Sequence, residues 1–136
     1  KFESGETGYS VYDKNGNIIF TYKYLGNNIV YRELNIQINP GCIISADYEE
    51  KKELLLIQVE HKDASYIEVY DKNGSYLTRI DSPRSYKFIS ITNNKGTIKA
   101  KAIGTSELTK DKYGRNEWIF KIDLDSYYVE KESISQ

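Results

Sequence analysis

The chain has 136 residues, with 19 Lys and Arg against 20 Asp and Glu, which gives a net charge of −1 at pH 7. This length fits one domain with its own core, and the near-neutral balance gives no electrostatic reason to expect nucleic acid or an acidic membrane as the main partner. Apolar residues make up 39% of the chain and are scattered, so no run is long enough to span a bilayer.

The first predicted element is a hairpin over residues 9–22. A β-rich run at 9–12 leads into Asp-Lys-Asn-Gly at 13–16, and an apolar run follows. Asp at the start of such a turn can accept hydrogen bonds from its own downstream backbone, and Gly takes the positive φ that returns the chain. The turn therefore predicts two antiparallel strands.

Residues 34–39 alternate apolar and polar side chains up to Pro40, which predicts a strand. Residues 46–56 contain good helix formers, but two apolar runs, 42–45 and 54–59, flank a charged centre at 49–52. A hairpin with the charged residues at a solvated tip explains both runs, and we prefer it to a helix.

The second half of the chain repeats these signals. Asp-Lys-Asn-Gly recurs at 71–74 between strands predicted at 65–70 and 75–80. Residues 87–92 and 97–103 alternate around a turn at 93–96, and a looser Asp-Lys-Tyr-Gly at 111–114 precedes a strand at 118–122. With the tail 131–136 expected to fray, the chain reads as one all-β domain, residues 1–136, of about ten strands in antiparallel hairpins.

The repeated turns also invite comparison with a calcium loop. An EF-hand loop needs oxygen ligands at positions 1, 3 and 5, Gly at position 6 and Glu at position 12. Here Gly falls at position 4, and Ser75 stands where the first copy has Asn17. A hairpin turn is the preferred interpretation.

The two windows 9–22 and 65–80 resemble the inner hairpin of bacterial β-propeller blades of the NHL or six-bladed type. The resemblance implies one blade over about 30–80, a second over about 87–129, and an N-terminal hairpin that is half of an earlier blade. Propellers close with about four to eight blades. The chain would therefore be a fragment, pair with a second copy as a homo-oligomer, or fold as an open β-sandwich or barrel.

Few residues suggest catalysis. His61 is the single histidine and lies at a predicted strand end among charged residues, and Cys42 is expected to be a small buried residue. One His and one Cys exclude a zinc site of the usual composition, and no glycine loop suits a phosphate, so no metal or cofactor is predicted. Paired carboxylates could still serve a small hydrolase; the candidates are Asp47 with Glu49, Asp81, Glu107, and Asp123 with Asp125.

Tyrosine is the unusual residue, with 13 copies against 4 Phe and one Trp. Tyrosines in strands mostly pack, but the two close pairs Tyr22/Tyr24 and Tyr127/Tyr128 place neighbouring rings on opposite faces or in a loop. At least one ring of each pair is therefore expected at the surface, as a candidate contact for a protein or a sugar. Trp118 is expected to anchor the core.

The sequence thus predicts a non-catalytic binding module that acts through protein–protein contact or self-assembly. The alternative is a secreted or cell-envelope module that recognises carbohydrate through exposed tyrosines, and the third hypothesis is the small hydrolase. Loss of a leader before Lys1 would favour a secreted or cell-envelope location, whereas the lone cysteine suits the cytosol equally well.

Overall fold

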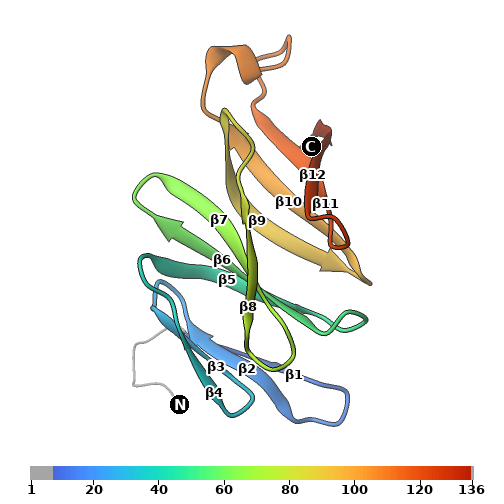
Figure 1. Cartoon of the computed structure of the whole chain (residues 1–136). Coiled ribbons are helices and arrows are strands. Elements are labelled where there is room, and N and C mark those ends of the chain that lie inside the picture. The colour runs from blue at the N-terminus through green and yellow to red at the C-terminus, as the bar shows by residue number, and fades with distance from the viewer. Residues whose placement is uncertain (1–7, 136) are drawn as a thin grey trace.

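The computed structural model describes residues 8–135, which form twelve strands and one 3₁₀ turn (Figure 1). The first sheet holds β1 (Gly8–Tyr12), β2 (Ile18–Lys23), β3 (Asn28–Tyr31) and β4 (Leu34–Gln37). The second sheet holds β5 (Cys42–Glu49), β6 (Leu54–His61), β7 (Ala64–Tyr70) and β8 (Tyr76–Asp81). The third sheet holds β9 (Tyr86–Asn94), β10 (Thr97–Gly104), β11 (Glu117–Asp123) and β12 (Tyr128–Ile134), with η1 (Glu107–Thr109) between β10 and β11.

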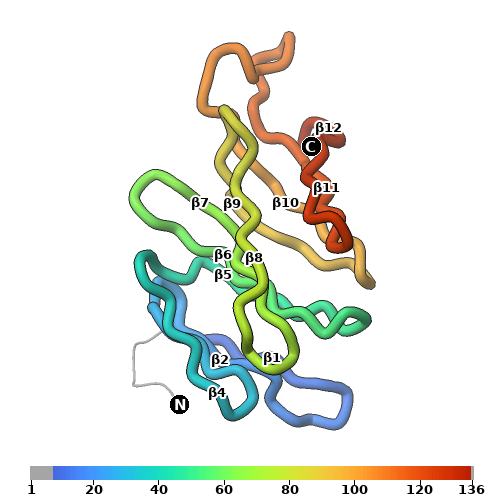
Figure 2. Tube along the Cα trace, viewed as in Figure 1, coloured from blue at the N-terminus to red at the C-terminus, as the bar shows by residue number. Residues whose placement is uncertain are grey.

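Each sheet is a four-stranded antiparallel meander in which neighbours in sequence are neighbours in space. The three sheets follow one another along the molecule, as the colour gradient in Figures 1 and 2 shows, and none closes into a barrel. The all-β class and the antiparallel hairpins predicted from sequence are confirmed.

Two hydrophobic cores join the three sheets, one on each face of the second sheet. The alternate residues Leu55, Ile57 and Val59 of β6 enter the core shared with the first sheet, whereas Leu54 and Leu56 enter the core shared with the third. Because β6 is buried on both faces, all of residues 54–59 except Gln58 are apolar.

The predicted hairpin at 42–59 is confirmed, because β5 and β6 pair from Cys42 opposite Glu60 to Glu49 opposite Leu54. The tip is less simple than the sequence suggested. Glu49 is buried rather than solvated, and its carboxylate accepts the backbone N–H of Lys52 at 2.9 Å.

The structure contradicts the expected start of the first blade and the half-blade at the N-terminus, whereas the expected second blade, about 87–129, falls within the third sheet. The first sheet is a complete four-stranded unit that ends at Gln37, and the second begins at Cys42 rather than near position 30. The repeated turn misled the prediction because it joins the first two strands of one sheet (β1 and β2) but the last two of the next (β7 and β8). It is a local hairpin device and does not mark the period of the sheets.

The C-terminal tail also differs from the prediction of fraying. Residues up to Ile134 belong to β12, with Lys131 opposite Phe120 and Ser133 opposite Ile119. The Lys131 ammonium lies 4.4 Å from the centre of the Trp118 ring, and this contact ties the strand down. Gln136 lies outside the described residues.

The two outer faces of the stack are mainly polar, although Val30 on the first sheet and Ile103 on the third are exposed apolar side chains. On the first sheet, Ser10 bonds Thr21 through their hydroxyls at 3.0 Å and the Asn28 amide donates to Asn35 at 2.6 Å. On the third sheet, Ile98, Ala100 and Ala102 of β10 point into the core. The outward-facing side chains of this sheet include the ion pairs Lys99–Glu132 at 2.7 Å and Lys101–Glu117 at 3.9 Å. Neither face resembles the apolar faces that pack against the second sheet.

The connections between strands fall on two opposite edges of the stack, which we call the hairpin rim and the linker rim. On the hairpin rim the turns are short, and those of neighbouring sheets touch: a Cβ built on Gly74 would lie 2.6 Å from the Leu34 side chain. The linker rim carries the β6–β7 turn, the passage from β8 to β9 and the long β10–β11 loop. A hydrogen bond from the Thr105 N–H to the Ser85 carbonyl, 2.9 Å, joins the last two of these.

Candidate functional site

The four tyrosines proposed as contacts divide into buried and exposed members. Tyr22 is only 8% exposed, with its ring 5.3 Å from that of Tyr9, and burial raises the pKa of its hydroxyl. Tyr127 is half-buried against the second core. Tyr24 and Tyr128 are 47% and 65% exposed, so the expectation of at least one surface ring in each pair is confirmed, and Tyr22 is corrected to a core residue.

The two exposed rings do not form one surface. Tyr24 follows β2 in the first sheet, whereas Tyr128 begins β12 in the third sheet, at the far end of the stack (Figure 1). A concave aromatic strip containing both is therefore not formed.

The three Asp turns share one geometry. In each, one carboxylate oxygen accepts the N–H groups two and four residues ahead at 2.8–3.0 Å; the acceptors are Asp13, Asp71 and Asp111. The following glycines, Gly16, Gly74 and Gly114, have φ near +80°. The carboxylates thus serve the hairpin, as the turn chemistry predicted, and within residues 8–135 no group of three or more His, Cys, Asp or Glu side chains is placed to hold a metal.

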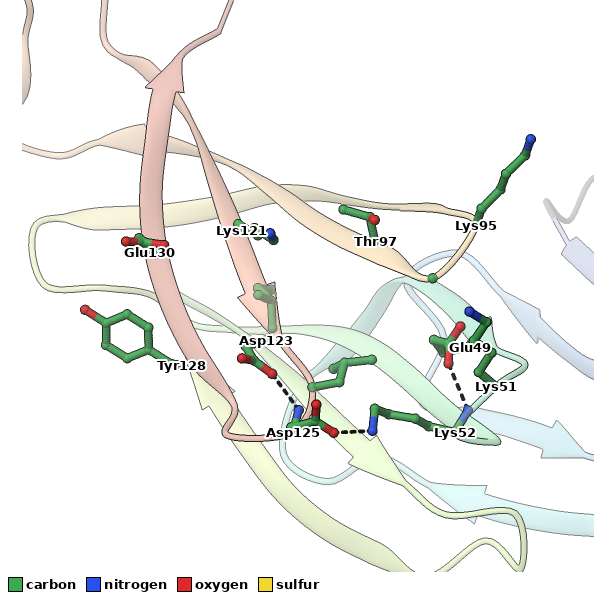
Figure 3. A pocket seen from close by; sticks show the side chains of 13 residues that line it. Glu49, Lys51, Lys52, Lys95, Thr97, Lys121, Asp123, Asp125, Tyr128 and Glu130 are labelled. Carbon is green, nitrogen blue, oxygen red and sulfur yellow. Dashed lines mark hydrogen bonds and ion pairs between the residues drawn. The ribbon is translucent and has the colours of Figure 1, made fainter.

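A cleft of about 440 Å³ opens on the hairpin rim between the β5–β6 tip and the third sheet (Figure 3). We call it the lysine cleft, because four lysines line it together with four carboxylates and Tyr128. Lys52 forms an ion pair with Asp125, which raises the pKa of the lysine, and Asp123 accepts the Asp125 N–H at 2.8 Å. The Lys52–Asp125 ion pair thus joins the β5–β6 hairpin to the β11–β12 hairpin.

Three of the carboxylates considered for hydrolysis line the lysine cleft: Glu49 and the predicted pair Asp123 and Asp125. Asp81 lies on the linker rim and Glu107 belongs to η1. Burial raises the pKa of Asp47, but this residue does not line the lysine cleft with its predicted partner. A paired-carboxylate hydrolase stays a prediction.

A larger cleft, about 620 Å³, opens on the linker rim. We call it the tyrosine cleft; its walls include Tyr66, Tyr76 and Tyr86. Tyr66 is buried beneath the Arg79 guanidinium, whose carbon lies 4.5 Å from the ring centre, while Tyr76 is 55% exposed. His61 also reaches this cleft, half-buried at the end of β6.

The most exposed apolar side chain of the described residues is Leu108, at 96%. It stands on the display loop, which we define as residues 105–116 between β10 and β11 and which extends from the end of the stack in Figure 1. Tyr113 follows on the same loop and is 70% exposed, with Lys112 and Arg115 within 5.1 and 5.3 Å of its ring.

The display loop is firmly held at its base. The Thr109 hydroxyl lies 2.8 Å from the Asn116 side-chain oxygen, the Asn116 amide donates to the Gly104 carbonyl at 3.0 Å, and the Trp118 indole N–H donates to the Thr109 carbonyl at 2.9 Å. Trp118 is accordingly half-buried and supports both the second core and this loop. Cys42, expected to be buried, is half-buried and free.

Sequence reasoning missed Tyr76, Arg79 and Leu108. A signal existed for Leu108, because it is an isolated large apolar residue in an otherwise polar segment. Strict alternation would place Tyr76 and Arg79 on opposite faces of their strand, so sequence alone could not bring them to one cleft. A register shift in the β7–β8 pairing next to Tyr76 and the position of the β8–β9 passage bring both to it.

No protein-family model matches the chain, and no characterised protein or solved structure is significantly similar to it. Among residues 8–135 no helix is long and apolar enough to cross a membrane.

Proposed function

We propose that this protein is a non-catalytic binding module that acts through protein–protein contact, with the display loop as its principal contact. The observation that carries the proposal is Leu108, which is 96% exposed on a loop whose base is held by hydrogen bonds. No other large apolar side chain of residues 8–135 is as exposed.

The energetic argument concerns what a partner would gain. Burying one leucine side chain is worth about 1.5–3 kcal/mol, and a tyrosine brings a large ring that loses little conformational entropy. Because the loop is already ordered, binding would not have to pay again for fixing Leu108 and Tyr113 in place. The neighbouring Lys112 and Arg115 would form a polar rim around this contact.

The polar outer faces bear on self-assembly. Each apolar sheet face of the stack already packs on a neighbour, and the outer faces carry hydroxyl, amide and ion pairs. Terminal units with polar outer faces end a stack of repeats. We therefore place any self-association at the display loop rather than at the sheet faces.

The resemblance to propeller blades enters the proposal in a limited form. Three four-stranded meanders that pack face to face in chain order are compatible with blade-like units. The polar ends favour a finite stack of three such units over a closed ring made with a second copy.

The test places a photo-crosslinking amino acid at position 108 and, as the matched control, at Leu25, an exposed leucine in the turn between β2 and β3. A protein captured at 108 but not at 25, whose affinity then falls on the order of tenfold or more in Leu108→Asp, supports the proposal. Equal affinity of Leu108→Asp and the unsubstituted protein for the captured partner contradicts it.

Light scattering tests the self-assembly arm. A dimer that Leu108→Asp converts to a monomer supports association through the display loop. A dimer unaffected by Leu108→Asp would place the interface elsewhere and refute this part of the proposal.

A further inference from the structure

We propose that the tyrosine cleft is a second binding site, and that its ligand is a neutral oligosaccharide. The site is separate from Leu108 of the display loop, and the inference does not depend on the protein-binding proposal. It takes the carbohydrate alternative away from Tyr24 and Tyr128 and assigns it to the tyrosine cleft, which extends along β8 from Tyr76, next to the β7–β8 turn, to the linker rim.

The shape of the cleft is suitable. Its volume of about 620 Å³ lies within the range of about 300–1,000 Å³ typical of sites that enclose small ligands. Its walls come from the β6–β7 turn, the outer part of β7 and β8, and the β8–β9 passage. A ligand there would contact several segments at once.

An aromatic platform is present. Tyr76 is 55% exposed and its ring meets that of Tyr70 edge-on, with the centroids 5.7 Å apart. The edge contact with a buried ring fixes the orientation of Tyr76. The C–H face of a pyranose ring packs on such an aromatic face, while the phenol oxygen remains available to a sugar hydroxyl.

Donors and acceptors stand side by side next to this platform. Arg79 lies over the Tyr66 ring at 4.5 Å and is held by Asp81, with 2.8 Å between Nε and the carboxylate. Glu68 on the adjacent strand accepts the Tyr70 hydroxyl at 2.6 Å. Sugar hydroxyls both donate and accept hydrogen bonds, so they can use a guanidinium and carboxylates together.

The equal numbers of basic and acidic side chains in the cleft favour an uncharged ligand. Three basic side chains line the cleft, Arg79, Arg84 and Lys87, and so do three carboxylates, Asp63, Glu68 and Asp81. Lys87 is further neutralised by Glu60 at 2.6 Å. A phosphate would meet the carboxylates and a cationic peptide would meet the arginines, whereas an uncharged polyol meets no uncompensated repulsion.

The linker wall is also fixed before any ligand arrives. The Ser82 hydroxyl accepts the Phe88 N–H at 3.0 Å and contacts the Ser65 carbonyl, and the Tyr86 N–H donates to the Pro83 carbonyl at 3.0 Å. A preformed wall lowers the entropic cost of holding a flexible saccharide.

The experiment is calorimetric titration of the full chain with a panel of neutral tetrasaccharides (malto-, cello-, xylo-, manno- and chito-oligosaccharides) and with an acidic oligogalacturonide. We expect at least one neutral member to bind. Tyr76→Ala should weaken that binding on the order of tenfold or more, since stacking and a hydrogen bond are lost together. Asp63→Asn, an exposed substitution with little risk to folding, should weaken it by a smaller factor.

The control is Tyr128→Ala, which removes a comparably exposed tyrosine outside the tyrosine cleft and should leave saccharide binding unchanged. Leu108→Asp should also leave it unchanged, which separates this proposal from the protein-binding one. Absence of binding by every neutral member, binding of the acidic oligosaccharide alone, or equal affinity of Tyr76→Ala and the unsubstituted protein would each overturn the inference.

Discussion

Gly104 at the base of the display loop provides the sharpest test of how that loop is held. A Cβ atom at this position would lie 1.9 Å from the Thr109 hydroxyl oxygen and 2.1 Å from the Asn116 side-chain oxygen. Neither contact is possible, so Gly104→Ala must push both side chains away from their places. The change adds only one methyl group, yet it acts on the group of hydrogen bonds that closes the loop.

The magnitude follows from those contacts. Forcing a methyl group into a packed site costs about 1–3 kcal/mol. Displacement also loses the Thr109–Asn116 bond at 2.8 Å and the Asn116–Gly104 bond at 3.0 Å, worth about 0.5–1.5 kcal/mol each. Together these costs come to about 2–6 kcal/mol, and we expect the free energy of unfolding to fall by an amount in this range, a large part of the stability of a typical domain.

The assay uses the single tryptophan of the chain. Trp118 donates its indole N–H to the Thr109 carbonyl at 2.9 Å, so displacement of Thr109 exposes this N–H to water. Urea unfolding followed by Trp fluorescence gives the loss of stability. Hydrogen exchange of the indole N–H by NMR reports the loop itself, and we expect faster exchange in Gly104→Ala.

Gly114→Ala is the matched control within the same loop. Its Cβ would meet nothing within 4 Å, but its φ of +81° costs about 1–2 kcal/mol for alanine. This variant should lose that smaller amount and keep slow indole exchange. If Gly104→Ala unfolds like the unsubstituted protein and its indole exchange is unchanged, the loop is not held as described.

Three further predictions concern the sheets and turns. Tyr31→Phe should leave the free energy of unfolding unchanged or raise it by about 1 kcal/mol, because no partner stands in hydrogen-bond geometry to the buried Tyr31 hydroxyl, although Arg32 and Tyr48 lie close to it; a loss above about 1 kcal/mol in urea unfolding would contradict this. Gly74→Ala should destabilise more than Gly16→Ala, since both have positive φ but only the former meets another side chain, at 2.6 Å; thermal melts compare the pair. The hydrogen bond from the Asn17 backbone N–H lowers the pKa of Asp13 below 3.8, so the ionised carboxylate stabilises the fold above pH 3.8 and this stabilisation is lost as the pH falls through the lowered pKa. Between neutral pH and about pH 2, Asp13→Asn should therefore lose less stability than the unsubstituted protein. Equal losses in the two proteins would argue against this role of Asp13.

Much of the fold is legible in the sequence because hairpins are local. The Asp turns at 13–16 and 71–74 predict their strands correctly, since each carboxylate bonds only to residues two and four positions ahead. The same locality explains the wrong boundary predicted for the first blade. A turn that needs nothing beyond its own five residues can stand at any position in a sheet, so it carries no information about where one sheet ends.

The exposure of the paired tyrosines was only half predictable. Alternation places adjacent residues such as Tyr127 and Tyr128 on opposite faces of a strand, but Tyr22 and Tyr24 are two residues apart, so alternation does not separate this pair, contrary to the prediction from sequence. Phe20 and Tyr22 share the buried face of β2, and Tyr24 would have continued on it. The strand ends at Lys23, and Leu25 turns the chain with a φ of +63°, which leaves Tyr24 at the surface. The clefts were beyond reach, because each requires the relative position of two sheets.

Both proposed sites include segments of the linker rim, and the contrast between the sheet faces and the connecting segments explains why. The outer sheet faces are mainly polar and the inner ones are buried, so the rims remain as the surfaces where side chains can vary without disturbing a core. On the hairpin rim, short turns and ion pairs such as Lys52–Asp125 mainly hold neighbouring hairpins together. On the linker rim the chain has to pass between sheets, and these longer segments form the tyrosine cleft and the display loop. Thr105 lines the cleft, begins the loop and bonds to Ser85, so a substitution that displaces it should disturb both proposed activities, whereas Leu108→Asp and Tyr76→Ala should each disturb one.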